Sequence, residues 1–145
     1  MISILTAVIA SGVSFICTPT AVYDGDGPIW CAEGPKIRLA GIAAREMDGT
    51  CRSNQPCPKA DASEARNHLA ALVGKTTGRR PEGHILVKGA PLSCTSEGNG
   101  RGSRTAAWCV TPQGIDLSCA MVRAGMALTW AKYKGAEVCR HRSFR

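Results

Sequence analysis

The stretch of sequence that decides the fold reads Val22-Tyr23-Asp24-Gly25-Asp26-Gly27-Pro28-Ile29-Trp30-Cys31-Ala32-Glu33-Gly34-Pro35-Lys36-Ile37-Arg38-Leu39-Ala40-Gly41-Ile42. Its Asp-Gly steps accept the positive φ angles of tight hairpins, which predicts a turn over 24–27. Glu-Gly-Pro predicts a second turn over 33–35. The stretch therefore predicts three consecutive strands, over 14–23, 28–32 and 36–42.

The third of these strands has two different faces. Ile37 and Leu39 alternate with Arg38 and Ala40, so one pair is expected in the core and the other on the opposite side.

Beyond these strands the chain shows helix signals separated by short strands. After a polar loop over 48–59, Asp61 and Glu64 have capping-box spacing, and Gly74 stands where a helix would end. The apolar residues of that helix recur on one face: Ala65, Leu69 and Leu72. Two more strands, over 85–88 and 105–110, bracket a Gly-rich loop, and a second helix is capped by Asp116 and ends at Gly125.

This order of elements predicts an α+β domain that is mainly β. Three strands, a helix, two strands and a helix suit a five-stranded Greek-key barrel of the OB type with two or three appended helices. The chain contains no internal repeat and no low-complexity linker, so we expect one domain over 14–139, flanked by a leader over 1–13 and a basic tail over 140–145.

Eight cysteines in 145 residues indicate an oxidising compartment. There is no Cys-x-x-Cys pair, and His68, His84 and His141 lie at no metal-ligand spacing, which favours disulfides over zinc. Cysteines placed symmetrically about each predicted hairpin would be cross-strand neighbours, close enough to bridge. Eight cysteines permit about 105 pairings, so the following set is one hypothesis among them: Cys17–Cys31, Cys51–Cys57, Cys94–Cys109 and Cys119–Cys139.

The cysteines and the leader together predict a secreted or periplasmic protein. Residues 2–13 form an apolar run with small residues near its end, similar to the middle of a signal peptide. No stretch approaches the roughly 20 apolar residues of a membrane-spanning helix, so no membrane partner is expected. The net charge of +7 favours polyanionic partners.

No single motif assigns the chemistry. Asp24-Gly25-Asp26 is by itself a turn, and it lacks the Glu that an EF-hand loop needs at its twelfth position. The Gly-rich segment 98–102 precedes a strand rather than a helix, which argues against a P-loop and a dinucleotide fingerprint. No Gly-x-Ser-x-Gly elbow of a serine hydrolase is present.

Taken in order, however, these segments resemble the staphylococcal nuclease (thermonuclease) family. Residues 22–26 and 36–42, with Glu46, resemble its Asp-Gly-Asp-Thr and Arg-Leu-x-Gly-Ile-Asp-x-Pro-Glu pattern. Residues 104–108 are similar to its Gly-Arg-x-x-Ala-Trp strand, and 116–127 to the helix with its Val-x-x-Gly signature. The resemblance runs from about Phe15 to Tyr133 and implies hydrolysis of DNA and RNA phosphodiesters, usually with calcium.

The resemblance also implies a role for each matched residue. Arg38 and Arg104 would clamp the phosphate, since planar guanidiniums match its oxygens in pairs. Glu46 would orient or deprotonate the attacking water. Asp26 would bind the metal directly and Asp24 would support it.

Two further residues are candidates for nucleic-acid contact. Arg101 is an alternative second arginine, although the register of residues 106–108 favours Arg104. Tyr23 is an aromatic residue that suits base stacking, as are Trp30 and Trp108, and packing is the competing role for all three.

The chain also departs from the family pattern. Ala43 stands where the family has its second metal-binding Asp, and Arg45 stands where it has Pro. Because calcium prefers six to eight oxygen ligands, loss of a carboxylate predicts a weakened site. Either Asp48 replaces the missing ligand from the loop, or Arg45 places a cation where the metal would be.

Two other functions compete with a monomeric nuclease. A catalytically weak relative would only bind nucleic acid, and Ala43 favours it, whereas retention of Arg38, Glu46 and Arg104 opposes it. An exported structural or inhibitor-like domain would fit the cysteine density alone.

Overall fold

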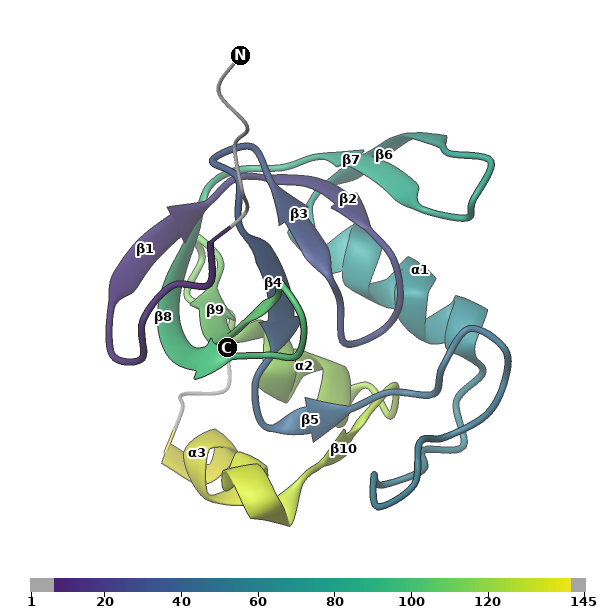
Figure 1. Cartoon of the computed structure of the whole chain (residues 1–145). Coiled ribbons are helices and arrows are strands. Elements are labelled where there is room, and N and C mark those ends of the chain that lie inside the picture. The colour runs from purple at the N-terminus through teal and green to yellow at the C-terminus, as the bar shows by residue number, and fades with distance from the viewer. Residues whose placement is uncertain (1–6, 142–145) are drawn as a thin grey trace.

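The computed structural model describes residues 7–141, so the first part of the predicted leader and the end of the predicted basic tail lie outside the described residues. Figure 1 shows a strongly curved sheet with helices against it and below it. In chain order the elements are β1 (Ser14–Cys17), β2 (Pro19–Val22), β3 (Ile29–Cys31), β4 (Lys36–Leu39), β5 (Ile42–Ala43), α1 (Ala62–Val73), β6 (Lys75–Arg79), β7 (Ile85–Lys88), β8 (Leu92–Asn99), β9 (Thr105–Val110), α2 (Leu117–Arg123), β10 (Leu128–Thr129), the 3₁₀ turn η1 (Ala131–Tyr133) and α3 (Gly135–His141).

The prediction of a mainly β, α+β protein is confirmed. Eight strands form one sheet in the order β1-β8-β9-β4-β3-β2-β7-β6, and β10 pairs with β5 in a second, two-stranded sheet. All pairs are antiparallel except β4 with β9, which run parallel with Arg38 opposite Ala106. Among the described residues neither sheet is closed, with β1 and β6 at the edges of the larger one, and the strands are more numerous than the five expected.

The difference from five strands has local causes. The predicted strand over 14–23 is interrupted at Thr18, whose backbone N–H and hydroxyl donate to the Glu33 carboxylate at 2.7 and 2.6 Å. The predicted strand over 36–42 is likewise divided at Gly41, which adopts a φ of +76°. The segment Leu92–Asn99, expected to lie largely in a loop, is the long strand β8.

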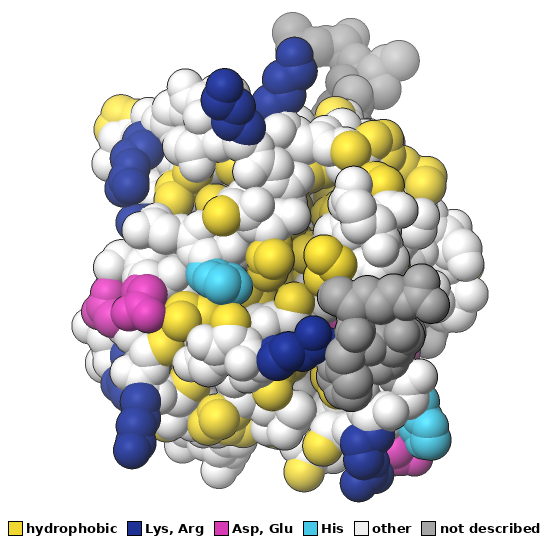
Figure 2. All heavy atoms as spheres, turned by 180° about the vertical axis from the view of Figure 1, so that it is seen from behind, with side chains coloured by type: hydrophobic (Ala, Val, Ile, Leu, Met, Phe, Trp, Pro, Cys, Tyr) yellow, Lys and Arg dark blue, Asp and Glu magenta, His cyan; other side chains and the backbone are white. Residues whose placement is uncertain are grey.

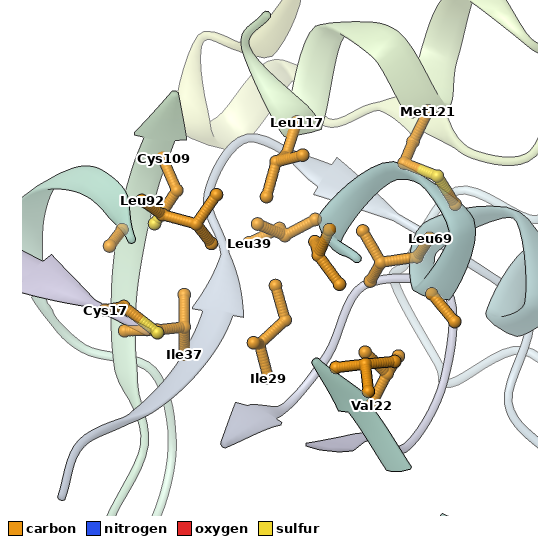
Figure 3. Packing of buried hydrophobic residues seen from close by; sticks show 14 of the residues in the cluster. Cys17, Val22, Ile29, Ile37, Leu39, Leu69, Leu92, Cys109, Leu117 and Met121 are labelled. Atoms are coloured by element: carbon orange, nitrogen blue, oxygen red, sulfur yellow. The ribbon is translucent and has the colours of Figure 1, made fainter. Parts of the chain in front are cut away.

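The core lies between the curved sheet and two helices. Ile37 and Leu39 of β4 are fully buried, as the alternation predicted. Figure 3 shows them facing Ile29 and the helical side chains of Leu69 and Leu117. Both predicted helix caps are present: the carboxylate of Asp61 accepts from the backbone of Ser63, and that of Asp116 accepts from the backbone of Cys119.

All four predicted disulfides are present: Cys17–Cys31, Cys51–Cys57, Cys94–Cys109 and Cys119–Cys139. Cys94 and Cys109 are direct partners in the register of β8 and β9. Four disulfides fit an extracellular protein. Among residues 7–141, no helix has the length and apolar character needed to cross a bilayer.

Candidate active site

The Asp24-to-Gly27 turn brings two acidic side chains into the interior. The amide of Gly27 donates to the Asp24 carbonyl at 3.1 Å, and Gly27 has a φ of +108°. A Cβ atom on Gly25 would lie 2.6 Å from that of Ala65 in α1, so only glycine lets the helix approach this closely. Asp24 and Asp26 are consequently 5% and 6% exposed.

One oxygen of the Asp26 carboxylate contacts two neighbouring donors. Its Oδ2 lies 3.1 Å from Nη2 of Arg38 and accepts the backbone N–H of Ala44 at 3.0 Å. The side chain of Arg38 is 15% exposed and also donates to the carbonyl of Leu39. This pair ties the turn before β3 to the centre of the sheet, since β4 lies between β3 and β9 (Figure 1).

Asp24 is held as an uncharged acid at neutral pH. Burial, followed by the charge of Asp26 and with a smaller effect from Glu46, raises the pKa of Asp24 to about 9. An oxygen of Asp24 accepts the backbone N–H of Asp26 at 3.1 Å. The two carboxyls of the turn thus differ in environment: one faces a guanidinium and the other does not.

Glu46 begins the long loop that follows β5. Its Oε1 lies 3.1 Å from Nε of Arg52, and these side chains are 25% and 44% exposed. The backbone of Glu46 exchanges hydrogen bonds with Thr50 and Gly49, and the Cys51–Cys57 disulfide closes the loop beside Arg52. Sequence reasoning missed Arg52, because its position follows no motif and depends on this loop.

The tight turn between β8 and β9 carries Arg101 and Arg104. The backbone N–H of Gly100 donates to the Arg104 carbonyl at 2.8 Å, and Arg101 has a φ of +80°. Nε of Arg104 donates to the Arg101 carbonyl at 3.3 Å. Both arginine side chains therefore extend from the same four-residue turn at the end of the β8–β9 hairpin.

Two adjoining hollows collect these side chains. The smaller hollow, of about 430 Å³, is lined by Arg52 and by five of the seven site residues predicted from the sequence: Tyr23, Asp24, Glu46, Arg101 and Arg104. The larger hollow, of about 900 Å³, is lined by Arg38, Trp108, Trp130 and Tyr133. Arg52 and Arg101 line both, so they stand where the hollows meet. Asp26 lies beneath, in contact with Arg38.

The aromatic residues divide between packing and lining. Trp108 is 5% exposed and packs with Ala40 and the Cys119–Cys139 disulfide. Trp130, which sequence reasoning missed, lies with its ring centre 6.0 Å from the Arg38 guanidinium and 4.8 Å from the ring of Tyr133. The helix pattern over 116–127, which precedes Trp130 in the sequence, does not indicate that this ring lies beside Arg38.

The two alternatives for replacing the missing Asp are not supported by the contacts. Asp48 is exposed and accepts from the backbone and hydroxyl of Thr50, which lowers its pKa. Arg45 donates to the carbonyls of Gly49 and Pro58 at 2.8 and 2.7 Å, so it fastens the loop. Ala43 is fully buried in β5.

The donor set does not fit a calcium ion as it is arranged. Calcium takes six to eight oxygen ligands, whereas Asp26 is paired with Arg38 and the raised pKa of Asp24 favours its uncharged form. Within residues 7–141, no three His, Cys, Asp or Glu side chains are grouped so as to hold a metal ion.

The surface charge is not confined to the hollows. Figure 2 shows the opposite side of the molecule from Figure 1, where Lys and Arg side chains lie mostly around the edge of a hydrophobic area.

Comparison with known proteins returns neither a matching family model nor a curated relative.

Proposed function

We propose that this chain is a phosphodiester hydrolase that cleaves DNA or RNA outside the cytosol. One observation carries the proposal: Glu46 and Arg104 line the same hollow, and that hollow adjoins the one lined by Arg38. These three residues come from three separate segments, and a carboxylate with guanidiniums in the same pair of hollows suits attack of water on a phosphodiester.

We also propose that the larger sheet is of the OB type, on the basis of its strand order. β1 and β2 are neighbouring parts of one bent segment, separated by Thr18. The strand order runs from this segment through β8, β9, β4 and β3 and back to it. A partly open Greek-key arrangement of this kind supports the resemblance to the thermonuclease family.

In the proposed reaction, the guanidiniums of Arg38 and Arg104 bind non-bridging oxygens of the phosphate. Glu46 takes a proton from a water molecule as its oxygen bonds to phosphorus, and the bond to the leaving sugar oxygen breaks. That oxygen takes a proton from solvent. The fixed positive charges stabilise the charge that develops on the phosphate in the transition state.

No step is assigned to a metal, because the present arrangement of Asp24 and Asp26 does not fit calcium. A weak divalent-metal site remains our expectation from the resemblance. Occupation of such a site would have to displace the proton of Asp24 or the Arg38 contact of Asp26.

The second candidate function is nucleic-acid binding without cleavage. Ala43 favours it, because the carboxylate that the family pattern places there is absent. Glu46 opposes it, because a carboxylate in a phosphate-binding hollow repels the ligand, whereas the proposed reaction needs one.

The test compares two arginines of one turn. We expect Arg104→Lys to lower kcat on single-stranded DNA about 100-fold while weakening binding much less, because lysine keeps the charge and loses the paired donors. Arg101→Lys is the matched control, with an expected change below about threefold. Loss of activity in Arg101→Lys alone would show that Arg101, and not Arg104, binds the phosphate with Arg38. Equal activity in all three proteins would contradict the proposal.

A further inference from the structure

The small hollow has an aromatic and cationic wall that the proposed reaction does not use. Tyr23, Trp30, Lys36 and His84 line it together with the catalytic candidates. The ring of His84 lies 5.0 Å from that of Tyr23 and 5.7 Å from that of Trp30. We refer to these four residues and Arg80 as the β3–β7 cluster.

Two cationic side chains of this wall contact the ring of Trp30. Nζ of Lys36 lies 4.4 Å from the centre of its ring, and the Arg80 guanidinium lies 5.7 Å from it. Both distances are those of cation–π contacts, which hold a cation in place without neutralising it. No ion pair with a carboxylate is recorded for either cation among the described residues, so both charges remain available to an anion.

The turn of the β6–β7 hairpin carries Arg80 and His84, and hydrogen bonds within the turn and from α1 hold it in place. Figure 1 shows this hairpin extending beyond α1. Across the turn, the backbone N–H of Arg80 donates to the His84 carbonyl, and the backbone N–H of Gly83 donates to the Arg80 carbonyl, each at 2.9 Å. Arg66 of α1, which is 7% exposed, donates to the Gly83 carbonyl at 3.0 Å. The turn is therefore held where Arg80 and His84 face Trp30.

The cluster also contains unsatisfied polar atoms. Nδ1 of His84 and Nε1 of Trp30 are buried and have no hydrogen-bond partner within residues 7–141. Buried polar atoms of this kind are uncommon in folded proteins and call for a water molecule or a ligand group.

We propose that the β3–β7 cluster is a second subsite for the substrate strand, which binds a nucleotide other than the one at the cleaved phosphate. Its base stacks against the half-buried rings of Tyr23 and His84, while Lys36 and Arg80 contact its phosphate. A single-stranded polynucleotide is the fitting occupant, because stacking rings combined with unpaired cations bind bases and backbone together. This inference rests on the proposed function, since it places the subsite beside Glu46 and Arg104.

The subsite has a defined place relative to the larger hollow. The cluster and Trp130 belong to different hollows, and Arg52 and Arg101 line both of them. A strand that enters past Trp130 and leaves past His84 would cross the proposed catalytic residues. A short oligonucleotide would fill only part of this path, and a long one would reach the cluster.

The experiment measures binding by fluorescence anisotropy in a Glu46→Gln background, so that substrate is not consumed. The probes are labelled oligothymidylates of about nine and about three nucleotides. Arg80→Ala and His84→Ala are expected to weaken binding of the long probe about fivefold each and to leave the short probe unchanged. Arg80→Ala should also reduce the slope of log affinity against log salt by about one, and His84→Ala should not.

Two controls separate a binding role from a structural one. Arg79→Ala removes the same charge from the adjacent residue of the hairpin, and we expect a change below about twofold with either probe. His84→Phe keeps a ring and should restore the binding that His84→Ala loses. If Arg80→Ala and His84→Ala match Arg79→Ala with both probes, the subsite is overturned. Cleavage by the parent protein, measured separately, would then still support the proposed function.

Discussion

At the scale of single residues, the Asp24 carboxyl has the environment least suited to a charge. It is 5% exposed, and its pKa is raised to about 9 by burial first and by Asp26 second. In the unfolded chain an aspartate ionises near pH 4. Between these two values the folded protein holds a proton that the unfolded chain releases, so stability falls as the pH rises from about 4 to about 9.

This linkage predicts the effect of Asp24→Asn. The amide keeps the shape and cannot ionise, so the variant should be more stable at pH 8 than the parent by at least about 1 kcal/mol, or about 3 °C in Tm. Thermal unfolding in the presence of a chelator, at pH 5 and pH 8, measures the effect. The gain should be smaller at pH 5, and a gain that is equal at both pH values would contradict a raised pKa for Asp24.

Residue-level prediction from sequence succeeded where local chemistry decides the outcome. Asp61 and Asp116 are helix caps because their short carboxylates reach free amides in the first turn, and neighbouring residues suffice to predict this. Arg52 and Trp130 were missed because their contacts with Glu46 and Arg38 depend on how distant segments pack. No spacing in the sequence encodes those contacts.

At the scale of elements, the loop between β5 and α1 determines the setting of Glu46. Arg45 fastens it through two carbonyls, Arg52 contacts Glu46 directly, and the Cys51–Cys57 disulfide lies beside Arg52. The Cys51–Cys57 disulfide is not part of the buried core cluster, whose disulfides are Cys17–Cys31 and Cys94–Cys109.

Removal of the loop disulfide should therefore affect activity more than folding. In the Cys51→Ser, Cys57→Ser double variant we expect kcat to fall about tenfold through loss of positioning of Arg52 and Glu46. Because the bridge closes a short loop, the free energy of unfolding should fall by no more than about 2 kcal/mol. The Cys119→Ser, Cys139→Ser variant is the control, because that bridge joins α2 to α3 and neither cysteine lines the hollow of Glu46.

Steady-state kinetics and urea unfolding on both double variants separate these effects. A loop variant that unfolds early but keeps its kcat would show that the disulfide serves stability alone. Equal losses of kcat in the two variants would show that the effect is not specific to the loop.

The elements also show where prediction from sequence stops. The turn over 24–27 and the strands over 85–88 and 105–110 were predictable, because Asp-Gly and short β-branched runs carry strong local preferences. β6 was missed because Lys75–Arg79 is polar and almost entirely exposed, so it shows no alternation. β8 was underestimated because Gly98 and Asn99 in its last part are typical of loops.

At the scale of the whole molecule, four disulfides and a net charge of +7 accompany a hollow that combines arginines with one glutamate. The charge alone would suit any polyanion, and the disulfides alone would suit many exported domains. The position of Glu46 is what distinguishes a hydrolase from a protein that only binds nucleic acid. Cleavage or retention of a bound strand therefore distinguishes these two functions.

The most direct measurement follows binding and cleavage of one labelled single-stranded DNA, and of its RNA counterpart, by the oxidised protein. The parent is compared with Glu46→Gln and with Glu97→Gln, which removes the same charge from the larger hollow, each with calcium, magnesium, manganese or chelator. We predict that the parent and Glu97→Gln cleave the strand, whereas Glu46→Gln binds it at least as tightly and cleaves at least about 100-fold more slowly. Tight binding without cleavage by the parent under every condition, or full activity in Glu46→Gln, would contradict the account.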